Sequence, residues 1–206
     1  MSVLHSIADV ASVIPRTHRT IVGIAGSPGA GKSTIGAALV AELGSDAVLL
    51  AMDGFHLPQA RLVELGRRER MGAPDTFDVD AFVSTLTALA DPGNSGNPVF
   101  APGFNREIEE PVPDDIRISP EIPVIVIEGN YLLLDSGGWE RVAPMLDVTL
   151  FVGVDPDLRR QRLIDRHVRF GKSLDAATAW ALGPDEANAR LIDATAARAQ
   201  YRVELP

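Results

Sequence analysis

The residues with the clearest chemistry form a glycine-rich segment that ends in a lysine and two hydroxyl side chains. The segment fits the pattern G-x-x-x-x-G-K-[ST] and directly follows an apolar, β-branched run at residues 20–25. Glycines allow backbone N–H groups to turn inward toward a chain of phosphates, and the N-terminus of a following helix adds positive potential. Chance would produce the pattern in roughly one or two of a thousand sequences of this composition. We predict that a nucleotide is bound by Gly26, Ser27, Pro28, Gly29, Ala30, Gly31, Lys32, Ser33 and Thr34.

Two side chains of this segment, together with one distant acid, predict how phosphate and metal are held. Lys32 is expected to reach the β- and γ-phosphates of ATP, and Ser33 to ligate Mg²⁺. Glu128 follows the apolar run at residues 124–127, at the expected carboxyl edge of a sheet, where open α/β sheets bind ligands. We expect Glu128 to bind the metal or to order its water, with a helix-capping or solvated acid as the alternative.

A second acid stands at the end of another apolar run. Asp53 directly follows residues 47–52. A carboxylate at a strand end beside the phosphate-binding strand can accept the proton of an attacking hydroxyl group. The alternative is a simple Asp-Gly turn. His56 follows three residues later and is predicted to contact substrate, with a packing or surface histidine as the alternative.

Four arginines recur with helical spacing in the last third of the chain. Spacings of three, four and three residues place Arg159, Arg162, Arg166 and Arg169 along one face of a helix. Such a row can neutralise the charge that develops on a transferred phosphoryl group, and a solvated basic face is the alternative. Gly171 follows the row and offers a hinge for a mobile lid.

The pattern of apolar residues predicts the elements that must position these groups. Strands are expected at residues 20–25, 47–52, 124–127 and 148–154, because each is a continuous apolar run. Helices are expected up to Leu43 with Gly44 as C-cap, at residues 59–70 and 78–90, and over 156–202 with breaks near residues 171 and 183–184. Residues 91–113 are predicted to be a long loop. Continuous apolar strands alternating with helices predict a doubly wound α/β domain with a parallel sheet.

Length, charge and composition restrict the class of protein. The 206 residues fit a single domain spanning 1–206, and 46% hydrophobic and 23% charged residues are typical of a globular chain. The net charge of −9 disfavours nucleic acid and anionic membranes as partners. The absence of cysteine excludes disulfides and thiolate sites. No signal peptide or spanning segment is recognisable, so we expect a cytoplasmic protein.

Five motifs point to a known family. They are Gly26 to Thr34, Met-Asp-Gly-Phe-His-Leu at 52–57, Glu-Gly-Asn-Tyr at 128–131, and the segments at 72–82 and 185–192 that accompany them. With these motifs, residues 19–199 resemble the P-loop kinases of the uridine kinase, phosphoribulokinase and bacterial pantothenate kinase family. The longer segments are most similar to a bacterial branch of nucleoside/nucleotide kinase-like proteins that carry the label of fructose transport system kinase.

The resemblance implies a fold and a set of roles. The fold would be a three-layer P-loop NTPase with a parallel five-stranded sheet and a helical lid at about 156–182. Asp53 would be the catalytic base, and Arg162, Arg166 and Arg169 the lid arginines. The residues expected at the acceptor site are His56, Phe77, Asp78, Arg106 and Tyr131.

The chain departs from uridine kinases in the acceptor loop. Those enzymes carry a Tyr-Asp pair and a His before an Arg, whereas this chain has Phe100-Ala101 and then Phe104-Asn105-Arg106. The missing Asp removes an acceptor for nucleobase hydrogen bonds, which argues against uridine as the substrate.

The predicted function is that of an ATP-dependent kinase that phosphorylates a hydroxyl group of a small metabolite, such as a sugar, nucleoside or pantothenate-like alcohol. The expected assembly is a monomer or homodimer. One alternative is an ATP-binding sensor or regulatory ATPase without a phosphorylated acceptor. A GTPase switch is disfavoured because both lysines follow glycine, so the motif Asn-Lys-x-Asp cannot occur.

Overall fold

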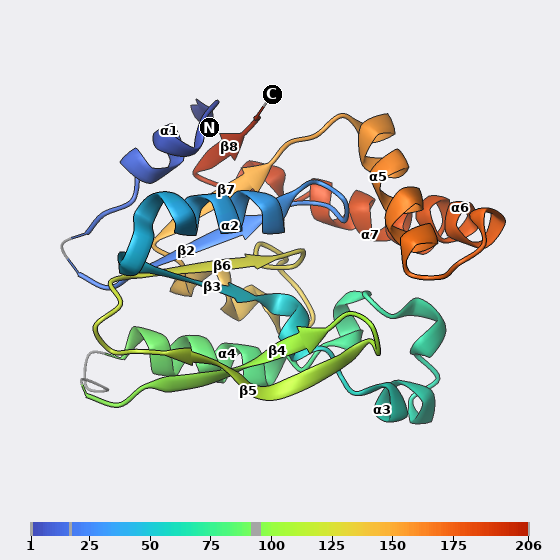
Figure 1. Cartoon of the computed structure of the whole chain (residues 1–206), viewed down its shortest axis with the longest axis horizontal. Helices are drawn as coiled ribbons and strands as arrows, with labels where there is room; N and C mark the ends of the chain where they lie inside the picture. The colour runs from blue at the N-terminus through green and yellow to red at the C-terminus, as the bar shows by residue number, and fades with distance from the viewer. Residues whose placement is uncertain (1, 17, 92–95, 206) are drawn as a thin grey trace.

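A parallel β-sheet of six strands runs through the centre of the molecule (Figure 1). The computed structural model describes residues 2–16, 18–91 and 96–205. The strand order across the sheet is β1-β8-β7-β2-β6-β3, and all of its neighbouring pairs are parallel. The strands are β1 (Ser2–Leu4), β2 (Thr20–Ala25), β3 (Ala47–Ala51), β6 (Val124–Gly129), β7 (Val148–Val152) and β8 (Tyr201–Val203).

The four predicted apolar runs form four neighbouring strands of this sheet, β7-β2-β6-β3, and β3 lies at its edge. Strands β2, β6 and β7 are buried at every position, and Val22 pairs with Val126 on one side and Val148 on the other. The α/β fold with a parallel sheet is therefore confirmed, but the sheet has six strands where five were expected. The additional pairing joins β1 to β8, two three-residue strands from opposite ends of the described chain. Strand β8 also corrects the prediction of helix up to residue 202.

Two hydrophobic clusters, one on each face of the sheet, make the fold three-layered. On one face, α1 (Ile7–Ser12) and α2 (Lys32–Leu43) pack on the sheet through Val10 and Leu39, which are fully buried. On the other face, α4 (Val79–Ala90) contributes Phe82 and α7 (Pro184–Asp193) contributes Ile192. Figure 1 shows α2 and α4 on opposite sides of the strands.

The helices begin and end close to where the sequence predicts. Gly44 is the C-cap of α2, and the side chain of Asp78 caps α4 by accepting from the backbone N–H of Ala81. Asp155 caps α5 (Pro156–Arg169), and Pro156 is the first residue of that helix. The breaks near 171 and 183 separate α5, α6 (Leu174–Leu182) and α7. Residues 59–70 form only a short helix, α3 (Gln59–Glu64), and a separate turn at Arg68–Arg70.

The region predicted as a long loop instead contains an antiparallel hairpin. It comprises β4 (Val99–Asn105) and β5 (Glu110–Ile118), while residues 92–95 of the predicted loop lie outside the described part of the chain. The prolines and glycines of this stretch are typical of a loop, which is why the sequence predicts one. A separate two-stranded sheet tolerates proline better than a central strand does. Val99 and Ile118 hold the hairpin against the core. Among the described residues, no helix combines the length and apolar character needed to cross a membrane.

The hairpin packs so closely on the segment after β3 that only glycine fits at residue 54. A Cβ atom on Gly54 would lie 2.1 Å from the carbonyl oxygen of Pro102 in β4. We expect Gly54→Ala to lower the free energy of unfolding by about 1–3 kcal/mol, because the rigid backbone of the hairpin must move away. Urea unfolding followed by circular dichroism measures this loss. An unchanged midpoint of unfolding would contradict the close approach.

Candidate active site

The glycine-rich turn connects β2 to α2 and shapes a cavity over the start of the helix. Gly29 has φ +79°, and a Cβ atom there would lie 2.9 Å from the carbonyl oxygen of Arg159, so glycine is required for both reasons. Gly31, with φ +98°, is the N-cap of α2. We call the space that it borders the P-loop cavity, which has a volume of about 190 Å³. Its lining consists of Gly29, Gly31, Lys32, Ser33, Thr34, Arg162 and Arg166.

The lysine of the turn is buried and held by two oxygen atoms. Lys32 Nζ donates to Asn130 Oδ1 at 2.6 Å and to the Ser27 carbonyl at 3.2 Å. Burial lowers the pKa of Lys32, and the nearby carboxylates of Glu128 and Asp53 oppose that shift. A buried ammonium group that is hydrogen-bonded to neutral oxygen atoms is suited to bind an anionic ligand such as a phosphate.

A second contact, made by the last residue of α7, stabilises the same turn. The Ser27 hydroxyl donates to Asp193 Oδ1 at 2.5 Å. Neither Asn130 nor Asp193 was among the predicted site residues. Asn130 follows Glu128 in the Glu-Gly-Asn-Tyr motif and could have been found there, whereas no local pattern marks Asp193.

Ser33 and Glu128 meet where a metal ion is expected. The Ser33 hydroxyl donates to Glu128 Oε1 at 2.8 Å, and Glu128 is only 5% exposed. Burial raises the pKa of Glu128, and the negative charge of Asp53 raises it further. The described residues contain no group of three or more His, Asp or Glu side chains that could hold a metal by themselves. Mg²⁺ is commonly held by one or two protein oxygens together with phosphate oxygens, so the oxygens of Ser33 and Glu128 fit this ion.

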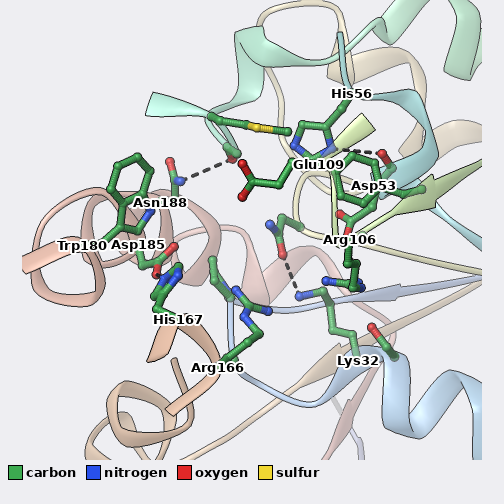
Figure 2. Close-up of a pocket in the computed structure, with 18 of the residues that line it drawn as sticks. Lys32, Asp53, His56, Arg106, Glu109, Arg166, His167, Trp180, Asp185 and Asn188 are labelled. Carbon is green, nitrogen blue, oxygen red and sulfur yellow. Dashed lines mark hydrogen bonds and ion pairs between the residues drawn. The ribbon is translucent and has the colours of Figure 1, made fainter. Parts of the chain in front are cut away.

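Asp53 lies on the turn after β3 and faces a second opening, which is lined by more residues and which we call the main cavity. The turn (Met52–Phe55) is a short 3₁₀ segment. Asp53 Oδ2 accepts from Arg106 Nη2 at 2.9 Å, and this arginine follows the last residue of β4. The main cavity, of about 180 Å³, adjoins the P-loop cavity through Gly29, Lys32, Ser33 and Arg166, which line both. Figure 2 shows Asp53, Arg106 and Lys32 on one side of it.

His56 is packed into the wall of the main cavity beside Asp53. Its ring lies 3.8 Å from the ring of Phe77 and 5.0 Å from that of Phe104, measured between centroids. Its Nδ1 atom lies 3.0 Å from the Asp53 carbonyl oxygen. Burial lowers the pKa of His56, although the charge of Asp53 acts in the opposite direction. The side chain is therefore both a packing residue and part of the cavity lining.

The lowered pKa of His56 predicts a loss of stability in mild acid. Because the pKa in the folded chain lies below the ordinary value of 6.5, the unfolded chain binds more protons as the pH falls past that value. The free energy of unfolding should therefore decrease below about pH 6.5. We expect His56→Gln to lose less stability than the native chain between about pH 7 and pH 5 in urea titrations. Parallel curves for the two proteins would contradict this assignment.

The structure brings most of the predicted site residues together and places several elsewhere. The main cavity is lined by Pro28, Gly29, Lys32, Ser33, Asp53, His56, Phe77, Arg106, Glu128 and Arg166, and the P-loop cavity adds Gly31, Thr34 and Arg162. The side chain of Asp78 caps α4, and the Tyr131 hydroxyl donates to the Gly72 carbonyl. Arg169 is exposed and lines neither cavity.

The row of four arginines does not face one direction in the folded chain. Arg159 is buried and paired with Glu186 of α7, whereas Arg162 and Arg166 border the cavities. The spacing alone placed Arg159 with the others, because the sequence does not reveal that α7 covers that side of α5. Arg159 is thus a packing residue that joins the two helices.

The far wall of the main cavity was missed by reasoning from the sequence. It is formed by α5 and α6, the connection between them, and α7. His167 Nε2 lies 2.7 Å from Asp185 Oδ2, and Asn188 Nδ2 donates to the Gly72 carbonyl at 3.3 Å. Lys172 and Trp180 complete this wall. The motif at 185–192 was noticed only as part of the resemblance, so it carried a signal without an assigned role.

A glycine-rich turn with a buried lysine, set between a central strand and a helix, defines a P-loop nucleotide-binding fold. The model of the Phosphoribulokinase / Uridine kinase family matches residues 21–204, and the chain belongs to this family. Its members are kinases, phosphotransferases that act on alcohol groups of small metabolites, which confirms the class of enzyme expected from the motifs.

Individual relatives agree with this family. An "ATP-dependent kinase-like protein notR'" of Aspergillus versicolor is 42% identical over 133 residues, 62% of this chain and 77% of that protein. The YggC protein of Escherichia coli K12 is 30% identical over 98% of this chain and 84% of its own length. A crystal structure of a "putative fructose transport system kinase" from Silicibacter sp. TM1040 has 35% identity and a TM-score of 0.85, covering 97% of this chain and 99% of that one.

Proposed function

We propose that this chain transfers the γ-phosphoryl group of ATP to a hydroxyl group of a small metabolite, with Asp53 as the base. The observation that carries the proposal is the meeting of the two cavities. A carboxylate, Asp53, and a phosphate-binding lysine, Lys32, line the same space, so an acceptor and a nucleotide could meet there. The volume of this space, about 180 Å³, suits a small acceptor.

The nucleotide would lie along the P-loop cavity. Backbone N–H groups at the start of α2 would face its phosphates, and Lys32 would bind the β- and γ-phosphates after giving up its contact with Asn130. Ser33 and Glu128 are the residues that would hold Mg²⁺. When bound, this ion neutralises charge on the phosphates of ATP.

Asp53 would act on the acceptor. Its carboxylate takes the proton of the acceptor hydroxyl while the oxygen forms a bond to the γ-phosphorus and the bond from that phosphorus to the bridging oxygen breaks. ADP leaves with the bridging oxygen, and the acceptor keeps the phosphoryl group. The contact with Arg106 fixes the orientation of the Asp53 carboxylate before the acceptor arrives.

Cations around the γ-phosphate would stabilise its charge during transfer. Arg166 lines both cavities, which supports the proposal that it contacts the phosphoryl group as this group crosses from one ligand to the other. Arg162 borders only the P-loop cavity and is proposed to contact the nucleotide. Arg169 would need the lid to move before it could reach either ligand. The net charge of −9 supports a small metabolite rather than nucleic acid or an anionic membrane as the partner.

The test is the release of ADP from Mg·ATP in the presence of a panel of acceptors. The panel spans fructose, other sugars, nucleosides, glycerate and pantothenate, and product phosphorylation is followed by mass spectrometry. We expect one class to stimulate ADP release and to gain a phosphate. Binding of ATP with no phosphorylated product in any class would instead support a sensor or regulatory ATPase.

A further inference from the structure

The chain's only two lysines line the same cavity. The sequence contains 19 Lys and Arg residues, of which two, Lys32 and Lys172, are lysines. Both border the main cavity, although they are 140 positions apart in the chain. Lysine differs from arginine in carrying a compact charge on a flexible stem. Since arginine is the basic residue at every position other than these two, the presence of Lys172 in this cavity indicates a specific function.

The backbone of Lys172 is fixed by the turn between α5 and α6. The N–H of Gly171 donates to the Val168 carbonyl and the N–H of Lys172 to the His167 carbonyl, both at 3.0 Å. This is the hydrogen-bond pattern of a Schellman motif, and Gly171 has the required positive φ, +96°. Ser173 then caps α6 by accepting from the N–H of Ala176 at 3.2 Å. A residue between two such caps has little freedom to move.

The side chain of Lys172 is oriented by an aromatic ring. Its Nζ atom lies 4.6 Å from the centroid of the Trp180 ring, within the range of a cation–π contact. Trp180 and Lys32 lie on opposite sides of the cavity in Figure 2. Lys172 does not line the P-loop cavity, so its ammonium group belongs to the wall that faces the acceptor rather than the nucleotide.

Within the described part of the chain, the ammonium group of Lys172 has no carboxylate partner. Two other cations of the main cavity are paired, Arg68 with Glu109 and Arg106 with Asp53. The acid that lines the far wall, Asp185, is hydrogen-bonded to His167. Among the described residues, no carboxylate forms an ion pair with Lys172. Arg166 also lacks one, but it borders both cavities and is already assigned to the phosphoryl group.

We propose that Lys172 binds an anionic group of the acceptor, a carboxylate or a phosphate ester, and thereby selects an acidic metabolite. This rests on the proposed kinase function. The molecule as a whole carries a charge of −9 and repels anions at long range, so an acidic acceptor requires a local cation that is not neutralised. Trp180 is a positioning residue, because it holds the ammonium group in place without needing to contact the acceptor.

The first experiment compares turnover of acceptors that differ only in charge. The pairs are glycerate with glycerol, fructose 6-phosphate with fructose, and pantothenate with pantothenol. We expect an anionic member to be phosphorylated with a kcat/KM at least about tenfold above its neutral counterpart. Lys172→Met should remove this preference by raising the KM for the acceptor, with the KM for ATP unchanged, and Lys172→Arg should restore part of it. A preference for the neutral members, or a higher KM for ATP alone in Lys172→Met, would overturn the proposal.

The second experiment does not depend on turnover. With the P-loop saturated by Mg·ADP, the chain is titrated with glycerate, fructose 6-phosphate, glycerol and fructose while tryptophan fluorescence is recorded. We expect at least one anion to change the emission of Trp180, and the change to be absent in Lys172→Met and in Trp180→Phe. The responding compound distinguishes a carboxylate from a phosphate ester as the bound group. A native chain that responds to neither anion, or a Lys172→Met variant that responds equally, contradicts the anion site.

The two experiments separate failure of this proposal from failure of the proposed function. Phosphorylation of neutral acceptors, unaffected by Lys172→Met, leaves the kinase function standing and removes the anion site. A fluorescence response that requires Lys172, in a chain that phosphorylates no compound, keeps the anion site and removes the kinase function.

Discussion

Replacement of Asp53 by asparagine is expected to lower kcat by about 10²–10⁴-fold, the usual contribution of a general base. Asparagine keeps the size of the side chain and can still accept the hydrogen bond from Arg106, but it cannot take a proton from the acceptor hydroxyl. The residues of the P-loop are not changed, so the dissociation constant of Mg·ATP should remain within a few-fold of the native value. Steady-state kinetics and calorimetric titration with ATP measure the two effects separately.

Asp80→Asn is the matched control for this substitution. Asp80 is paired with Arg141, its side chain is 83% exposed, and it lines neither cavity, so the same chemical change there should leave kcat unaltered. Native turnover by Asp53→Asn would remove Asp53 from the role of base. A parallel loss of ATP binding and turnover would show instead that the carboxylate acts on the nucleotide, through its charge near Lys32 and Glu128.

The parts of the fold that could be predicted are those determined by neighbours in the sequence. Strands β2, β6 and β7 are continuous apolar runs because both faces of each strand are covered, and that pattern is visible in the chain itself. Strands β1 and β8 have only three residues each and exist because the two ends of the chain pair with one another. The hairpin carries Pro102 and Pro111, which indicate a loop unless the contact with Gly54 is known.

The same distinction applies to the site. The P-loop residues are contiguous, so their spacing alone predicts the glycine-rich turn before α2. Asp53 and Glu128 could be predicted because Asp53 comes just after β3 and Glu128 lies at the end of β6, and parallel strands of one sheet end at the same edge. The far wall of the main cavity is different. Lys172, Asp185 and Asn188 reach it through the packing of α5, α6 and α7, which no local spacing specifies. Arg159 shows the converse. Its spacing correctly predicted a helix, but the sequence did not reveal that this side chain is buried.

Replacement of Trp139 by alanine is expected to lower the free energy of unfolding by about 3–5 kcal/mol, the usual loss for a large buried aromatic residue. Trp139 is fully buried and lies within 5.8 Å of the rings of Phe77, Phe82 and Tyr131 between centroids. Its indole N–H donates to the Pro74 carbonyl at 3.2 Å. Urea unfolding at pH 7 measures the loss, which is a large part of the total for a typical domain.

The expected damage from this substitution extends from the core to the acceptor side of the site. Trp139 donates a hydrogen bond to the carbonyl of Pro74, and Tyr131 donates one to the carbonyl of Gly72. Gly72 lines the main cavity, so both side chains fix the same loop of that cavity. The folded fraction of Trp139→Ala should therefore show a higher KM for the acceptor and an unchanged KM for ATP. Trp180→Ala is the matched control for stability, because Trp180 is only partly buried and its loss should move the unfolding midpoint much less. If both variants unfolded at the same urea concentration, the aromatic cluster around Trp139 would not be what anchors this loop to the core.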